Sequence, residues 1–175
     1  MDEDVMDEKV ISIEIGVPRH KVWDEITKTG RIQRAIYNSV LETNLVPGAK
    51  LRYYSPNHKR VFIVGEVVEV EAPARFAHTY RMTQWPDDEP TLVTWELEEI
   101  SSGCRVTITH SGWTEAHKTK DRVTTGWTEI LGLLKSELET GTIPFKWKVI
   151  YALMGAFMFA LPKTTKKEEV DRLGW

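Results

Sequence analysis

The sequence is short of cysteine and has no excess of basic residues. Cys104 is the only cysteine among 175 residues, so an intrachain disulfide is excluded and a reducing cytoplasm is the expected compartment. The net charge of −3 disfavours binding to nucleic acid, which requires a basic face against the phosphates. Residues 1–8 are mainly acidic, which predicts a solvated tail and is the opposite of the basic start of a signal peptide.

The motifs that define metal, cofactor and nucleophile sites are also missing. There is no H-E-x-x-H sequence, no Cys/His cluster, no G-x-S-x-G elbow and no glycine-rich phosphate loop. Cys104 shares a strand face with apolar residues, which predicts a small buried side chain. Glu66 beside a histidine would allow acid–base chemistry, although a solvated strand glutamate fits the pattern better. The sequence therefore predicts no metal and no cofactor, and it favours a binding protein over an enzyme.

No apolar run is long enough to cross a membrane. The thirteen residues of Val149–Leu161 carry no charge, and five lysines flank them: Lys146, Lys148, Lys163, Lys166 and Lys167. A helix over about 146–161 would have an apolar span of roughly 20 Å, against the ~30 Å of a bilayer core. Two interpretations stay open. The helix packs on the domain or on a partner subunit, or it lies at a membrane interface with its lysines among the headgroups.

What the chain does contain is a series of alternating segments followed by one long amphipathic segment. Strands are predicted at 9–15, 49–54, 60–71, 75–84, 91–100 and 105–111, with short turns between them. Gly65 indicates a bulge or a close approach of another backbone. Helices are predicted over 18–27, 31–37 and 121–140, the last ending at Gly141. This order predicts an α+β domain with a helix packed on an antiparallel meander.

Several polar and aromatic side chains fall on the inner face of this predicted sheet. His78 and Tyr80 alternate with Phe76 and Met82 on one strand, and His110 follows Ile108 in phase. A buried imidazole or phenol without a partner costs about 1–3 kcal/mol. Either these groups satisfy one another in a solid core, or sheet and helix enclose a cavity. The candidate ligand-binding residues are Tyr53, Phe76, His78, Tyr80, Met82, Trp95, His110, Trp127 and Leu131.

Five segments in order resemble a known family, the one named after the activator of the heat-shock protein 90 ATPase. They are PRHKVWDEIT, GEVVEVEAPARFAHTY, VTWELEE, GCRVTITHSGW and GWTEILGLLKSELETG. The family falls within the START-like (SRPBCC) superfamily, which has the helix-grip fold of the birch-pollen allergen. The resemblance covers about residues 9–141 and departs from the family at Pro47-Gly48-Ala49. It implies about seven strands wrapped around the long helix, with 1–8 as a tail and 142–175 as an extension.

The resemblance also implies a deep cavity between the curved sheet and the long helix, used in the superfamily for lipids and other apolar molecules. It carries over no catalytic residue. The leading hypothesis is non-enzymatic binding of an apolar or amphipathic small molecule. One alternative is an interaction protein that modulates a chaperone ATPase, although we expect no room for the co-chaperone's additional N-terminal domain. Another is a cyclase- or hydrolase-type enzyme. A chaperone, a second copy of the chain or a membrane surface are the expected further partners.

Overall fold

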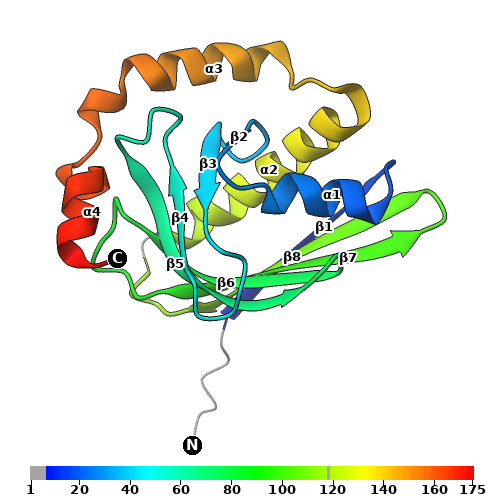
Figure 1. Ribbon diagram of the computed structural model, residues 1–175, viewed down its shortest axis with the longest axis horizontal. Coiled ribbons are helices and arrows are strands. Elements are labelled where there is room, and N and C mark those ends of the chain that lie inside the picture. The colour runs from blue at the N-terminus through cyan, green and yellow to red at the C-terminus, as the bar shows by residue number, and fades with distance from the viewer. Residues whose placement is uncertain (1–6, 118) are drawn as a thin grey trace, which may run out of the picture.

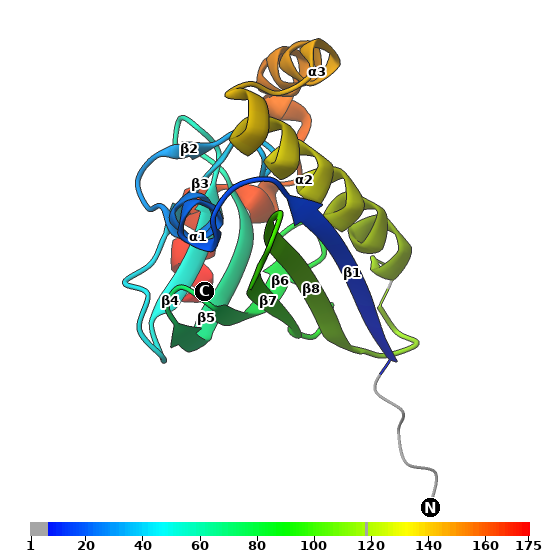
Figure 2. The ribbon, with the colours of Figure 1, turned by 90° about the vertical axis from the view of Figure 1, so that its right-hand side faces the viewer.

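The computed structural model describes residues 7–117 and 119–175 (Figure 1). A curled antiparallel sheet wraps around one long helix, and shorter helices follow at the C-terminus (Figure 2). The strands are β1 (Asp7–Ile15), β2 (Ile32–Gln33), β3 (Ser39–Glu42), β4 (Lys50–Tyr54), β5 (Val61–Glu71), β6 (Arg75–Met82), β7 (Thr91–Ile100) and β8 (Gly103–Trp113). The helices are α1 (Arg19–Thr27), α2 (Lys120–Thr140), α3 (Phe145–Ala156) and α4 (Lys167–Leu173), with 3-10 turns η1 (Met158–Ala160) and η2 (Lys163–Thr165).

The sheet has the strand order β1-β8-β7-β6-β5-β4-β3-β2 and is antiparallel throughout. This confirms the predicted helix-grip fold, with eight strands where about seven were expected. The predicted helix over 31–37 is wrong, since β2 pairs with β3 there. The buried Gln33 side chain donates to the main-chain carbonyls of Glu25 and Ile26, at 3.0 and 3.1 Å. The segment thereby satisfies the open C-terminal end of α1 instead of continuing as a helix.

The long helix α2 buries the stripe that its periodicity predicts. Val123, Trp127, Ile130, Leu131 and Leu134 are all buried between α2 and the sheet. Along β8, every second residue from Cys104 to His110 is buried, which is the alternation of a strand with one covered face. Burial raises the pKa of the Cys104 thiol, so the side chain is an unreactive part of the core.

His110 joins the helix to the sheet through hydrogen bonds at both ring nitrogens. The indole N–H of Trp127 donates to His110 Nδ1 at 2.8 Å, so this nitrogen carries no proton. His110 Nε2 then donates to Thr91 Oγ1 at 2.6 Å, and Thr91 donates in turn to the carbonyl of Tyr80 at 3.1 Å. Each of the side-chain polar atoms that these three hydrogen bonds join, on Trp127, His110 and Thr91, has a partner. The histidine that the sequence turns inward is therefore a neutral structural link between α2, β7 and β8.

Gly65 marks an irregular place between β5 and β6. A side chain there would put its Cβ 2.0 Å from the carbonyl oxygen of Thr79, so the two backbones approach closely only because position 65 is glycine. The regular pairing pauses between Val64–Arg81 and Val67–His78, and it shifts again between Val67 and Glu69. The close approach suggested by the sequence is thus present, and Glu66 beside it points to solvent.

The chain beyond α2 forms a strap that leaves the domain and returns to it (Figure 1). The helix predicted over about 146–161 is shorter: α3 ends at Ala156 and η1 follows. At the far end, α4 packs its buried Val170 on the outer side of β4 and β5, beside Tyr54, Val61 and Val64. None of the helices that the structure describes is both long and apolar enough to cross a membrane.

Replacing His110 with leucine tests the structural link. At pH 7 the variant leaves the buried Trp127 N–H without an acceptor, which lowers the free energy of unfolding by about 1–3 kcal/mol. Desolvation lowers the pKa of His110 to about 3, against about 6.5 in the unfolded chain. The wild type therefore loses stability as the pH falls below 6.5, by up to about 1.4 kcal/mol per pH unit from this residue. The variant lacks this loss, so the two stabilities converge toward pH 4.

Urea unfolding at pH 7, 5.5 and 4 measures both effects, with His20→Leu as the control. His20 is exposed on α1, so this change should alter stability by no more than about 0.5 kcal/mol. Parallel stability curves for the wild type and His110→Leu would contradict the assignment of His110 as a buried neutral imidazole.

Candidate functional site

A cavity of about 470 Å³ lies between α2 and the half of the sheet formed by β4, β5 and β6. Helix α2 lies close to β1 and stands further from these three strands, which leaves the space open. Its walls are mainly apolar, and the strap after α2 supplies one of them. The lining residues are Ile36, Tyr37, Ser39, Tyr53, Phe62, Ile63, His78, Tyr80, Met82, Gln84, Trp85, Arg122, Val123, Gly126, Trp127, Ile130, Met154, Phe157, Met158 and Leu161.

His78 presents an unpaired hydrogen-bond acceptor among these apolar walls. Its Nδ1 donates to the carbonyl of Thr79 at 2.8 Å, which leaves the proton-free Nε2 as an acceptor. Within the described chain Nε2 has no hydrogen-bond partner, although the side chain is only 1% exposed. Desolvation lowers the pKa of His78 to about 4, so the ring is neutral at physiological pH. His78, a residue of the cavity wall, therefore carries a buried hydrogen-bond acceptor that has no partner within the described chain.

Two tyrosine hydroxyls line the same cavity. Neither the Tyr53 nor the Tyr80 hydroxyl has a hydrogen-bond partner among the residues that the structure describes. The Tyr53 ring lies beside His78, with 6.3 Å between ring centroids, and burial raises the pKa of both phenols. Each hydroxyl is therefore protonated and free to donate or accept.

The structure separates the nine candidate residues into two groups. Tyr53, His78, Tyr80, Met82 and Trp127 line the cavity. Phe76, Trp95, His110 and Leu131 were expected in the wall as well, but they are buried in the core and are not among the described residues that line the cavity. Trp95 packs edge-on against Trp127 at 5.6 Å, which explains why it supports the wall without reaching the space. A ligand-binding role stays a prediction for all nine.

Periodicity could not find some of the lining residues. Tyr53 pairs with Ile63, and Ile63 pairs with Met82, so these three follow the regular register onto one face. Phe62 does not, because the register with β4 shifts from Tyr53–Ile63 to Tyr54–Val61 and leaves Phe62 as the extra residue of a bulge. Met154, Phe157, Met158 and Leu161 come from the strap, whose path the sequence pattern does not specify.

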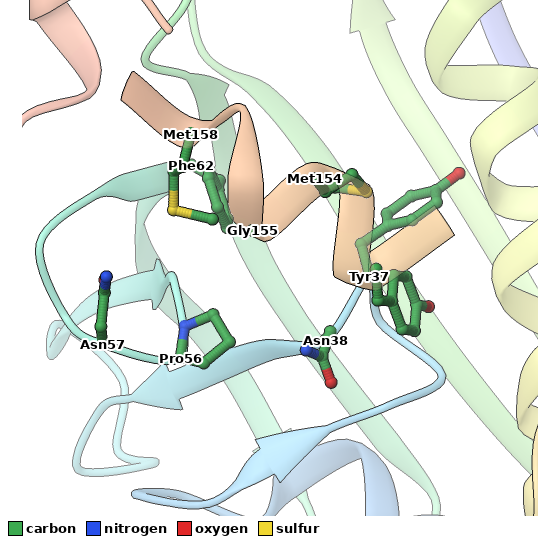
Figure 3. Close-up of a pocket in the computed structure, with 9 residues that line it drawn as sticks. Tyr37, Asn38, Pro56, Asn57, Phe62, Met154, Gly155 and Met158 are labelled. Carbon is green, nitrogen blue, oxygen red and sulfur yellow. The ribbon is translucent and has the colours of Figure 1, made fainter. Parts of the chain in front are cut away.

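A smaller pocket of about 130 Å³ lies beside the main cavity (Figure 3). Tyr37, Phe62, Met154 and Met158 line both spaces, so the strap rests its two methionines between them. Figure 3 shows Met154 and Met158 on the strap, with Phe62 near Met158. Methionine side chains are flexible, so they can repack around guests of different shape.

A cationic side chain lies at the rim of the cavity, whereas His78, Tyr53 and Tyr80 deeper in its wall are neutral. Arg122 is exposed at the cavity, with its guanidinium 5.2 Å from the centroid of the Trp85 ring. No group of three or more His, Cys, Asp or Glu side chains that could hold a metal ion occurs within 7–117 and 119–175. The arrangement suits reversible binding of an apolar molecule, and it brings no nucleophile next to an activating base among the cavity residues that the structure describes.

Comparison with known proteins agrees with this architecture. A solved protein from Mesorhizobium loti matches with a TM-score of 0.65 at 17% identity, covering 78% of this chain and 100% of its own. An HSP90 activator from Plasmodium falciparum has a TM-score of 0.62 at 21% identity, covering 79% and 98%. The Aha1 dimer from Colwellia psychrerythraea has a TM-score of 0.63 at 19% identity, covering 78% and 99%. These likenesses show the fold.

At the level of sequence, no curated protein matches the chain. The sequence model of the family described as "Activator of Hsp90 ATPase homolog 1-like protein" matches residues 16–139. That range runs from the end of β1 through most of α2 and holds the whole sheet except β1. The chain belongs to the Activator of Hsp90 ATPase homolog 1-like protein family.

Proposed function

We propose that the protein binds an apolar or amphipathic small molecule in the cavity between α2 and strands β4–β6. The observation that supports this most directly is the cavity itself, whose volume of about 470 Å³ is within the range of ligand sites, about 300–1,000 Å³. Met82, Ile63, Val123 and Ile130 give apolar contact area. Because the walls are mainly apolar, transfer of an apolar guest from water onto them is favourable.

The unpaired acceptor of His78 supports a guest with an O–H or N–H group at its buried end. Such a donor would bond to Nε2 and remove the cost of an unsatisfied buried polar atom. The hydroxyls of Tyr53 and Tyr80 can accept from or donate to the same head group. A carboxylate suits this end less well, because its lone pairs would face that of Nε2 and the only cationic side chain in the described wall, Arg122, is at the rim.

The first test is uptake of 1-dodecanol, measured by native mass spectrometry. We expect one molecule bound per wild-type chain and strongly reduced uptake by Met82→Trp, because the indole would occupy part of the cavity. Val68→Trp is the matched control: it adds the same ring at an exposed position of β5 and should leave uptake unchanged. Absence of any adduct with the alcohol, a sterol or an aromatic probe would end the proposal.

The second test compares 1-dodecanol with its methyl ether, which has the same chain but no O–H donor. The wild type should bind the alcohol about 2–13-fold more tightly, corresponding to one hydrogen bond of about 0.5–1.5 kcal/mol. His78→Phe should bind both compounds equally, because the ring is kept and the acceptor is lost. A preference for the alcohol that survives in His78→Phe would show that the donor is recognised elsewhere, and Tyr53→Phe and Tyr80→Phe would then locate it.

A second candidate function comes from the family rather than from the cavity. The family description names an activator of the Hsp90 ATPase, and one structural neighbour is an HSP90 activator. On this proposal the domain binds a chaperone and changes its ATPase rate. The ATPase rate of the chaperone from the same organism, measured with and without an excess of this protein, decides the question. An unchanged rate together with no binding removes this candidate and leaves small-molecule binding untouched.

A further inference from the structure

The strap from Ile143 to Thr165 is anchored at both ends and exposed in the middle. Ile143 is 2% exposed in the main core. At the other end, Arg60 donates to Thr165 Oγ1 at 2.9 Å, and the main-chain N–H of Lys167 donates to the carbonyl of Lys59 at 3.1 Å. Between these anchors, no residue of α3 or η1 is buried. The fold therefore fixes an apolar helix in place without covering it.

The inner side of α3 is fastened to the domain by a few side chains. Tyr151 donates from its hydroxyl to the carbonyl of Arg34 at 2.6 Å, and the Trp147 ring lies 5.9 Å from that of Tyr37. Met154, one turn further along the same stripe, lines the cavity. These contacts fix the rotation of the helix about its axis, so the opposite side is held facing outward.

That outward side is apolar. Phe145, Val149 and Leu153 follow one another at four-residue intervals, opposite the Trp147–Tyr151 stripe, and they are 78%, 43% and 54% exposed. Phe159 in η1, the turn that follows α3, is 76% exposed. Large apolar side chains that are exposed together, on a helix held rigidly at both ends, indicate a surface that meets a partner.

The charges around this surface indicate what the partner is. Residues 142–167 contain five lysines and no acidic residue, in a chain whose net charge is −3. Lys166 and Lys167 lie near Glu168 and Asp171 of α4, at 3.6 and 2.6 Å. Lys146, Lys148 and Lys163 form no ion pair with any residue that the structure describes, and all three are exposed. Cations therefore lie at both ends of an apolar strip.

We propose that α3 and η1 dock on an anionic lipid surface, with Phe145, Val149, Leu153 and Phe159 in the interface and Lys146, Lys148 and Lys163 at the headgroups. Twelve residues of α3 span roughly 18 Å, which is too short for a bilayer core of about 30 Å. The helix therefore lies in the plane of the surface, with its apolar side toward the lipid. A second copy of the chain fits less well. With lysines at both ends of the strip, either orientation of two copies would bring cations against cations.

The position of this surface gives it a role in exchange, which rests on the proposed function. Met154, Phe157, Met158 and Leu161 line the cavity from the same segment that carries the outward apolar side. Docking therefore places the lid of the cavity against the lipid, where an amphipathic guest would enter or leave without crossing water. The docking itself requires no guest in the cavity.

Co-sedimentation with vesicles tests the docking. The probe is the full chain with vesicles of phosphatidylcholine alone, or with 30% phosphatidylglycerol. We expect binding to the anionic vesicles, at least about tenfold weaker binding to the neutral ones, and a marked loss in 0.5 M salt, where charge interactions are screened. No sedimentation with anionic vesicles overturns the proposal.

Paired variants identify the surface. Leu153→Asp with Phe159→Asp should lower vesicle binding about tenfold or more, because charged side chains replace the two apolar contacts. Val10→Asp with Val68→Asp introduces the same charges at exposed valines on the sheet and should have a much smaller effect. Equal losses in the two double variants would refute the assignment to α3 and η1. Replacing Lys146, Lys148 and Lys163 with glutamine should remove the preference for anionic vesicles.

Two further measurements distinguish lipid docking from self-association of the chain and from small-molecule binding in the cavity. Sedimentation velocity without vesicles should show a monomer, and a dimer that Leu153→Asp with Phe159→Asp dissociates would assign the surface to a second copy instead. Uptake of 1-dodecanol in the absence of vesicles should be the same in that variant as in the wild type, because neither residue lines the cavity. Normal uptake without vesicle binding refutes docking alone, and vesicle binding without uptake refutes the cavity function alone.

Discussion

The hydrogen-bonded chain from Trp127 through His110 to Thr91 fixes the distance between α2 and the sheet. It joins the helix to β7 and β8, and all three side chains are buried, so they form hydrogen bonds with one another instead of with water. A neutral imidazole is suited to this position, because it can accept at one nitrogen and donate at the other. With α2 held against the β1–β8 side, the strands β4, β5 and β6 curl away from it (Figure 2). The cavity is the space that this one-sided attachment leaves.

Local irregularities in the strands then determine what lines that space. At Gly65 the backbone of β5 approaches Thr79, and the carbonyl of Thr79 accepts from His78 Nδ1. That bond selects the ring tautomer and leaves Nε2 as the free acceptor. The bulge at Phe62 turns an aromatic ring toward the cavity that a regular strand would turn away. The two inward histidines thus differ in kind: His110 is satisfied on both sides, whereas His78 is satisfied on one.

Much of the fold could be predicted from the sequence, and the reason is local. Alternation in segments such as RVTITH and the stripe of Val123, Trp127 and Leu134 depend only on which face of an element is covered. The assignment of single residues to core or cavity could not be predicted, because Trp95 and Tyr80 both point inward and both lie near Trp127 of α2, at 5.6 and 6.0 Å between ring centroids, yet only Tyr80 of the two lines the cavity. The prediction of a helix over 31–37 was wrong for a related reason. The side chain of Gln33 bonds to the end of α1, which is a tertiary contact that no local pattern contains.

The strap shows the same division between local pattern and tertiary placement. Its apolar composition is plain in the sequence, and that composition alone is equally compatible with a packed helix and an interfacial one. The tertiary contacts add what the pattern lacks: Ile143 and Thr165 are buried, and Tyr151 sets the rotation of the helix, yet Phe145 and Leu153 stay exposed. Because the segment is apolar on both sides, packing its inner side over the cavity leaves an outer side that water solvates poorly. A lid of this kind is at its most stable when a second apolar phase meets its outer face.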